Sequence, residues 1–89
     1  MTSRTTASFR KAFDALPEDI QDRARKAFEL FSENPGHPGL RLKQVHATEP
    51  IYAARITLHY RALARRGDRV WIWFWIGSHA DYDRFLKHL

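Results

Sequence analysis

A run of seven apolar residues, Val70 to Ile76, constrains the fold more than any other feature of this 89-residue sequence. Side chains alternate between the two faces of a strand, so the run places Trp71, Trp73 and Trp75 on one side and its other four side chains on the opposite side. A strand that is apolar on both sides is typical of the centre of a sheet. We therefore expect one face to pack on helices and the other to be covered by a C-terminal helix or by a protein partner.

Two helices are predicted on the N-terminal side of the strands. Two groups of apolar side chains recur at the three- and four-residue spacing of a helix face: Phe9, Ala12, Phe13 and Leu16, then Ile20, Ala24, Ala27, Phe28 and Phe31. Pro17 separates the two helices, and the second should end near Asn34, because residues 34–39 include two prolines and two glycines. The β-prone residues 5–9 predict a short N-terminal strand.

From Leu40 onward the apolar pattern changes to a period of two, which predicts strands. The expected strands cover residues 40–45, 52–59, 60–66 and 70–76, with a tight turn at Gly67–Asp68, and a short helix is expected over residues 81–89. The predicted fold class is α+β, with an N-terminal β-strand, a two-helix hairpin packed on a mainly antiparallel four-stranded sheet, and a short C-terminal helix. A chain of this length predicts one domain over residues 1–89.

The net charge of +5 is concentrated in one segment of the chain. Residues 41–69 carry seven Lys and Arg against two Asp and Glu, whereas residues 1–40 carry six of each kind and residues 70–89 carry two of each. A concentrated basic patch is typical of a surface that binds a polyanion such as nucleic acid. The alternative is a charged face that only keeps the protein in solution.

Several kinds of site are excluded or disfavoured by composition. The chain has no cysteine, which excludes disulfides, thiolate zinc sites and a cysteine nucleophile. Its five histidines include no His-x-x-x-His pair, so we expect no metal and no other cofactor. No stretch of about 18 apolar residues is present to span a bilayer, and the first residues lack an apolar leader. We therefore expect a cytoplasmic protein with no membrane partner.

Six short segments follow one another in an order that carries more information than any of them alone. They are Leu16-Pro17, Asn34-Pro35 and residues 40–45, 52–55, 59–61 and 75–79. In this order the chain resembles the RelE/ParE toxin superfamily of bacterial type II toxin–antitoxin systems. The resemblance implies a cytoplasmic toxin that a cognate antitoxin neutralises. Ribonuclease members cleave mRNA, commonly on the ribosome, whereas ParE-type members poison DNA gyrase, and the shared fold does not distinguish the two.

The resemblance also implies roles for individual side chains. His79, after the Gly77-Ser78 strand end, corresponds to a catalytic acid or base, and imidazole titrates near neutral pH; the alternative is a histidine that caps the last helix. Arg61 and Arg55 correspond to cations that grip the scissile phosphate, and their alternative is a solvated strand surface. Five further residues are expected to contact RNA: Lys43, His46, His59, Arg41 and Tyr82. For Tyr82, core packing is the alternative.

These residues predict a metal-independent endoribonuclease, an mRNA interferase in which the 2′-hydroxyl of RNA attacks the scissile phosphate. Ala53 and Ala54 stand where some ribosome-dependent members have paired lysines, so the chain is closest to the histidine-using RelE-like members. Two alternatives remain. One is a ParE-type gyrase inhibitor, which needs neither an acid nor a base, and the other is a non-catalytic homologue that binds an antitoxin or nucleic acid. The expected partners are a cognate antitoxin and mRNA, with the ribosome left open.

Overall fold

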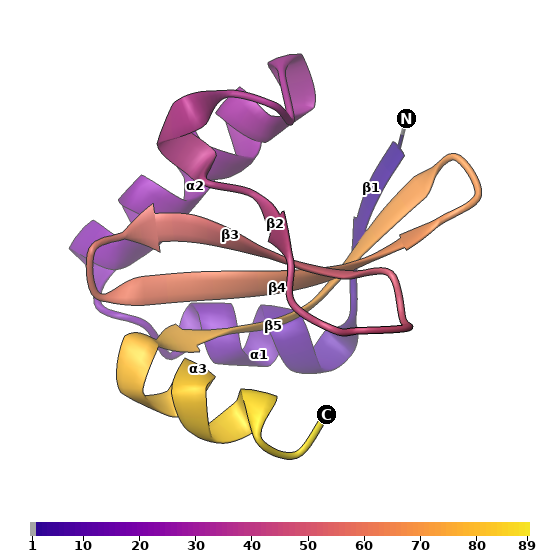
Figure 1. Cartoon of the computed structure of the whole chain (residues 1–89). Helices are drawn as coiled ribbons and strands as arrows, with labels where there is room; N and C mark the ends of the chain where they lie inside the picture. Colours follow the sequence, from indigo (N-terminus) through magenta and orange to yellow (C-terminus); the bar gives the residue numbers. More distant parts are fainter. Residues whose placement is uncertain (1) are drawn as a thin grey trace.

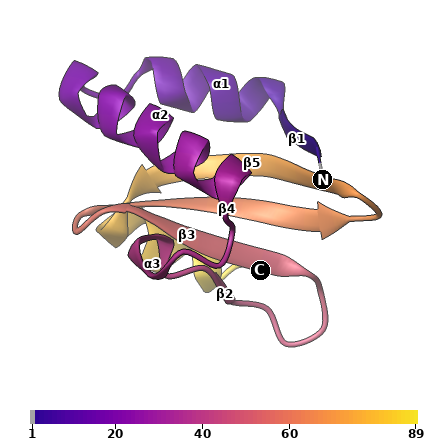
Figure 2. The same cartoon turned by 90° about the horizontal axis from the view of Figure 1, so that it is seen from above.

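Five strands form one mixed sheet in the order β1-β5-β4-β3-β2 in a computed structural model that describes residues 2–89 (Figure 1). The strands are β1 (Thr2–Thr5), β2 (Lys43–Gln44), β3 (Ile51–Thr57), β4 (Tyr60–Gly67) and β5 (Val70–Ser78). The helices are α1 (Ala7–Asp14), α2 (Glu18–Glu33) and α3 (His79–Leu86), with a short 3-10 helix, η1 (Pro38–Leu40), before β2. Helices α1 and α2 cover one face of the sheet and α3 covers the other (Figure 2). The predicted α+β architecture is confirmed.

The N-terminal strand lies earlier than predicted and makes the sheet five-stranded rather than four-stranded. β1 pairs in parallel with β5, while the other neighbouring strands pair in antiparallel fashion. The strand cannot extend to Phe9, because Thr6 caps α1: its Oγ1 accepts a hydrogen bond from the Phe9 amide at 3.1 Å.

The helix hairpin forms as predicted. α2 begins directly after Pro17, has Glu18 and Asp19 in its first turn, and ends one residue before Asn34. The side-chain amide of Gln21 donates to three carbonyl oxygens at the end of α1 and in the connecting loop, at 3.1–3.2 Å, and so fastens the two helices together. Within residues 2–89, no helix combines the length and the apolar composition that crossing a membrane requires.

The two faces of β5 depart from simple alternation because the strand contains a bulge. Leu63 of β4 lies opposite Trp75, and the next residue of β4 lies opposite Trp73, so Phe74 is an extra residue on β5. As a result Trp71 and Trp73 pack under α1 and α2, whereas Trp75 packs on the α3 face. The prediction that the three tryptophans share one side of the strand was therefore wrong.

The edge strand and two turns also differ from the prediction. Residues 40–42 do not form a strand, because η1 extends to Leu40 and the residue that caps it, Arg41, has a left-handed backbone with a φ of 46°. Only the two residues of β2 then pair with β3. His59 lies in the turn between β3 and β4, and the turn between β4 and β5 is formed by Asp68 and Arg69.

Helix α3 begins two residues earlier than expected and ends at Leu86 rather than at Leu89. Its start is fixed by Ser78, whose hydroxyl accepts a hydrogen bond from the Asp81 amide at 3.2 Å. His79 is therefore the first residue of the helix and lies directly at the end of β5.

Candidate active site

A cavity of about 410 Å³ opens on the α3 side of the sheet, and basic side chains dominate its lining. The lining residues, termed the basic pocket below, are Arg41, Lys43, Ala53, Ala54, Arg55, Arg61, His79 and Tyr82. They come from β2, β3, β4, α3 and the segment after η1. The pocket brings together six of the eight side chains that sequence reasoning selected as catalytic or RNA-binding.

Two arginines are immediate neighbours in the basic pocket. Arg55 on β3 and Arg61 on β4 are direct register partners. Like charges directly opposite each other on adjacent strands destabilise the pairing. Burial lowers the pKa of Arg61 below its usual value, and the positive charges of Arg55 and Arg41 lower it further. An anion bound between the two guanidinium groups would relieve this repulsion.

Arg61 is held in one orientation by the turn between β3 and β4. Its Nη1 atom donates to the carbonyl oxygens of Thr57 at 2.6 Å, Tyr60 at 3.0 Å and Leu58 at 3.3 Å. Within residues 2–89, no hydrogen bond or ion pair engages its Nε and Nη2 atoms. The edge of the guanidinium that carries these two atoms is therefore available to donate two parallel hydrogen bonds to an anion.

Gly77 lies opposite Arg61 on β5 and permits the ring of Trp75 to approach the strand. A Cβ atom at position 77 would lie 2.9 Å from two carbon atoms of that ring, closer than real side chains allow. Trp75 in turn stacks on Phe85 of α3, with ring centroids 5.4 Å apart. This contact helps to hold α3 against the sheet.

His79 and Asp83 lie one helical turn apart on α3. The Nδ1 atom of His79 is 3.2 Å from the Oδ2 atom of Asp83. The backbone amide of His79 donates to the carbonyl oxygen of His59 at 2.7 Å, which ties the start of α3 to the turn between β3 and β4. A carboxylate beside Nδ1 favours the tautomer with its proton on that atom and leaves Nε2 as a proton acceptor. The imidazole is 45% exposed, so a substrate can reach it.

Tyr82 belongs both to the core and to the basic pocket. Only 5% of the residue is exposed, and its ring packs against Trp75 and His79 with centroid separations of 6.3 and 5.6 Å. Burial raises the pKa of the Tyr82 hydroxyl above its ordinary value of 10.0, although the charge of Arg61 lowers it. The hydroxyl is therefore protonated at neutral pH.

Lys43 and Arg41 complete the basic pocket at the edge of the sheet. Lys43 is the register partner of Ala53, whose small side chain belongs to the core on the α3 face. Arg41 has a left-handed backbone, which is unfavourable for a residue with a side chain. In the part of the chain that the structure describes, Arg41, Lys43, Arg55 and Arg61 form no ion pair with a carboxylate. Their charges are thus left uncompensated around one cavity.

Two histidines selected from the sequence lie outside the basic pocket. The Nδ1 atom of His46 accepts hydrogen bonds from the amides of Thr48 and Glu49 at 3.2 and 2.9 Å, so this side chain organises the loop between β2 and β3. His59 lines a neighbouring cavity instead.

Sequence reasoning missed Asp83, and it identified Gly77 only as part of a strand end. The four-residue spacing between His79 and Asp83 was a usable signal once a helix was expected there. Trp75 and Gly77 share a face because they lie two residues apart on one strand, but the sequence did not reveal that this is the α3 face, because that depends on the bulge in β5.

The chemistry available in the basic pocket is proton transfer and anion binding. His79 and Tyr82 can exchange protons with a substrate, and four cationic side chains can stabilise negative charge. Among residues 2–89, no cluster of three or more His, Asp and Glu side chains is placed to hold a metal ion.

Comparison with known proteins gives a family and a set of similar folds. The model of the ParE-like toxin domain matches residues 18–84, a range that contains all eight residues of the basic pocket. A chain of the RelB–RelE antitoxin–toxin complex from Methanococcus jannaschii is 18% identical, with a TM-score of 0.74 over 91% of this chain and 96% of that chain. YafQ from E. coli is 10% identical, with a TM-score of 0.73 over 90% and 94% of the two chains.

A third similar structure is a chain of the RelBE2 toxin–antitoxin complex from Mycobacterium tuberculosis. It is 25% identical, with a TM-score of 0.69 over 88% of this chain and 96% of that chain. No curated protein sequence matches the chain significantly.

Proposed function

Because the chain belongs to the ParE-like toxin domain family, and so to the RelE/ParE toxin superfamily, we propose that it is the toxin of a toxin–antitoxin pair and cleaves mRNA as a metal-independent endoribonuclease. The neighbours from M. jannaschii and M. tuberculosis come from complexes of a toxin with its antitoxin, which supports a cognate antitoxin as the partner of this chain. The proposed site of action is the cytoplasm, where mRNA is found.

One observation carries the ribonuclease proposal. The basic pocket combines the two kinds of group that metal-free RNA cleavage needs: a histidine with a carboxylate 3.2 Å from its Nδ1 atom, and two adjacent arginines without a carboxylate partner among residues 2–89. A gyrase inhibitor that acts by protein contact requires neither of them. The pocket therefore favours ribonuclease activity over the gyrase alternative.

In the proposed reaction the RNA supplies its own nucleophile. The Nε2 atom of His79 accepts the proton of the 2′-hydroxyl, the 2′-oxygen bonds to phosphorus, and the bond from phosphorus to the 5′-oxygen breaks. The attacking and leaving oxygens lie on opposite sides of the phosphorus, so a second group must protonate the leaving oxygen. Tyr82 is that donor in our proposal, because its hydroxyl is protonated at neutral pH. The products are a 2′,3′-cyclic phosphate and a free 5′-hydroxyl.

The arginines act on the phosphate itself. Arg61 presents its Nε and Nη2 edge, and Arg55 lies beside it on the next strand. Their charges stabilise the extra negative charge that develops on the phosphate oxygens in the transition state. Arg41 and Lys43 bind the neighbouring RNA backbone and so contribute to substrate affinity rather than to the chemical step.

The proposal is tested by RNA cleavage with the purified protein, with and without ribosomes. His79→Ala and Arg61→Ala should each slow cleavage at least about tenfold, because a positioned acid or base is worth roughly 10²–10⁴ in rate. His46→Ala and Arg65→Ala are the matched controls, since they remove a histidine and an arginine outside the basic pocket. Circular dichroism checks that every variant is folded.

The competing functions are separated by measuring plasmid supercoiling beside RNA integrity. If supercoiling is lost while RNA stays intact, the gyrase alternative is correct. If both are unaffected while the protein still binds its antitoxin, the chain is a non-catalytic homologue. Cleavage at the parental rate by both pocket variants contradicts the assignment of the site.

A further inference from the structure

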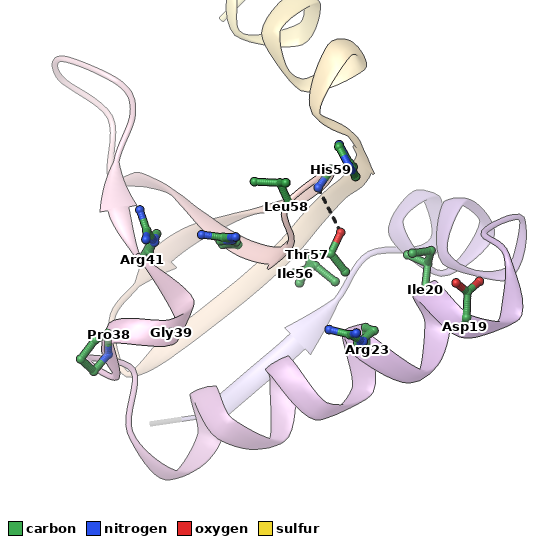
Figure 3. A pocket seen from close by; sticks show the side chains of 11 residues that line it. Asp19, Ile20, Arg23, Pro38, Gly39, Arg41, Ile56, Thr57, Leu58 and His59 are labelled. Atoms are coloured by element: carbon green, nitrogen blue, oxygen red, sulfur yellow. Dashed lines mark hydrogen bonds between the residues drawn. The ribbon is translucent and has the colours of Figure 1, made fainter.

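A second and larger cavity adjoins the basic pocket. Its volume is about 820 Å³, and it lies between α2 and β3, with η1 at one end and the turn between β3 and β4 at the other. Figure 3 shows Arg23 on the helix and Arg41 on the opposite side of the opening, with Leu58 and His59 on the turn. None of the sequence patterns singled out Arg23.

The charge of this second cavity is predominantly positive. Three arginines, Arg23, Arg41 and Arg55, line it together with one carboxylate, that of Asp19. Within residues 2–89, the three arginines form no ion pair, so the carboxylate does not neutralise any of them by direct contact. A cavity with this lining attracts an anionic ligand.

The two cavities are neighbours that share part of their lining. Arg41 and Arg55 line both of them. A hydrogen bond also connects their walls. Arg61 of the basic pocket donates to the carbonyl oxygen of Thr57 at 2.6 Å, and Thr57 lines the second cavity. A nucleic-acid strand with one phosphate beside Arg61 therefore meets a further set of cations where it leaves the basic pocket.

Apolar side chains lie among these cations. Leu58 is 61% exposed although it is a large apolar residue, and Ile20 and Ile56 line the same cavity. Sites for single-stranded nucleic acid combine cations that follow the backbone with side chains on which bases pack, and the His59 ring is suited to stacking. A double helix has no unstacked bases to use such a surface.

We infer that the second cavity is a subsite for the single-stranded RNA that flanks the scissile phosphate, and that Arg23 contacts a phosphate there. The inference rests on the proposed ribonuclease function. The two arginines shared with the basic pocket favour RNA over a segment of the antitoxin, because an RNA strand bound for cleavage has to leave that pocket along a path that accepts its charge.

The test uses 2′-O-methyl RNA, which lacks the nucleophile and cannot be cleaved in this way. Binding of a trinucleotide and of an oligonucleotide of about 12 nucleotides is measured by fluorescence anisotropy over a range of salt concentrations. Arg23→Gln should weaken binding of the longer RNA roughly fivefold and reduce the slope of log K against log salt by about 0.7, the value of one phosphate contact on a single strand. Binding of the trinucleotide should not change.

Arg25→Gln is the matched control, because it removes the same charge from the same helix. Arg25 pairs with Asp22 at 2.9 Å and lies over the Phe13 ring, away from the second cavity. The control should bind both RNAs as the parent does.

The outcomes distinguish the inference from the function on which it rests. If the parent cleaves RNA but Arg23→Gln and Arg25→Gln bind the longer RNA alike, the subsite is wrong and the ribonuclease stands. If the parent neither cleaves nor binds RNA, both proposals fail. If Arg23→Gln weakens only the complex with the antitoxin, the cavity is a protein interface and the inference is overturned.

Discussion

On the α1–α2 face of the sheet the aromatic side chains beneath the helices close over one another, whereas on the α3 face the side chains also surround the basic pocket. Phe9, Phe31 and Trp73 on the first face are each 2–3% exposed, and the rings of Phe31 and Trp73 meet edge to face at 5.0 Å. On the second face Leu63 of β4 is completely buried, while Arg61, two residues before it on the same strand, lies beside Arg55 in the basic pocket. The contrast indicates that one face chiefly maintains the fold and the other presents the chemistry.

The bulge in β5 links the two faces. It moves Trp75 to the α3 side, where its ring stacks on Phe85 and covers Gly77. The helix held in this way begins with His79. A single extra residue in the central strand therefore contributes both to the closed core and to the position of the imidazole.

The largest effect is expected on the closed face. Trp73→Ala should lower the free energy of unfolding by about 3–5 kcal/mol, because it removes a buried aromatic ring and leaves a cavity beneath α2. Urea unfolding followed by circular dichroism measures the change. A loss below about 1 kcal/mol, the scale of an ordinary point mutation, contradicts the division between the faces.

On the α3 face a substitution is expected to change the rate of cleavage more than the free energy of unfolding. Arg55→Gln should leave the free energy of unfolding unchanged or slightly higher, because it removes the repulsion with Arg61. The same variant should cleave RNA about tenfold more slowly, since a cation that stabilises the transition state is lost. Unfolding and cleavage are measured on the same preparation. If the variant loses stability but keeps its activity, the claim that the α3 face presents the chemistry is contradicted.

A smaller effect is expected at the carboxylate beside the imidazole. Asp83→Asn should reduce kcat on the order of fivefold with KM unchanged, because it weakens the orientation of His79 without removing the acid–base group, which is worth more. Asp81→Asn on the same helix is the control, since Asp81 pairs with Arg84 instead. Equal kinetics for the two variants exclude a positioning role for Asp83.

The smallest effect concerns Tyr82 at alkaline pH. Its pKa is raised by folding, so its contribution to stability is present below pH 10.0, the ordinary value for the side chain, and is lost as pH rises through the folded pKa. Tyr82→Phe should therefore show a shallower decline of unfolding free energy above pH 10.0 than the parent. Parallel curves in urea titrations at several pH values contradict the assigned shift.

Much of the fold was predictable because its periodicity is local. The spacing of apolar residues located α2 and the long strands, and the prolines and glycines of residues 34–39 marked the end of the helix hairpin. The bulge was not predictable, because inserting Phe74 among apolar residues leaves the pattern apolar on both sides. The left-handed backbone at Arg41, which shortens β2, likewise has no signal in its residue type.

The main residues of the candidate site could be predicted from the sequence, but not which of the selected residues lie outside the pocket. Charge concentration and family resemblance selected Arg55, Arg61 and His79, which line one pocket. The local pattern could not separate His46, which organises a loop through two backbone amides, from a side chain that faces the pocket. Such distinctions depend on tertiary contacts between segments far apart in the sequence.

The central claim is that the basic pocket directs the 2′-hydroxyl of RNA against the neighbouring phosphate. It is tested most directly by comparing an mRNA fragment with the same fragment carrying one 2′-deoxynucleotide at the mapped cleavage site, with and without ribosomes. Our account predicts that the parent protein cuts the first to leave a 2′,3′-cyclic phosphate and leaves the second intact at that site. Equal cutting of both fragments, or no cutting of either under both conditions, contradicts it.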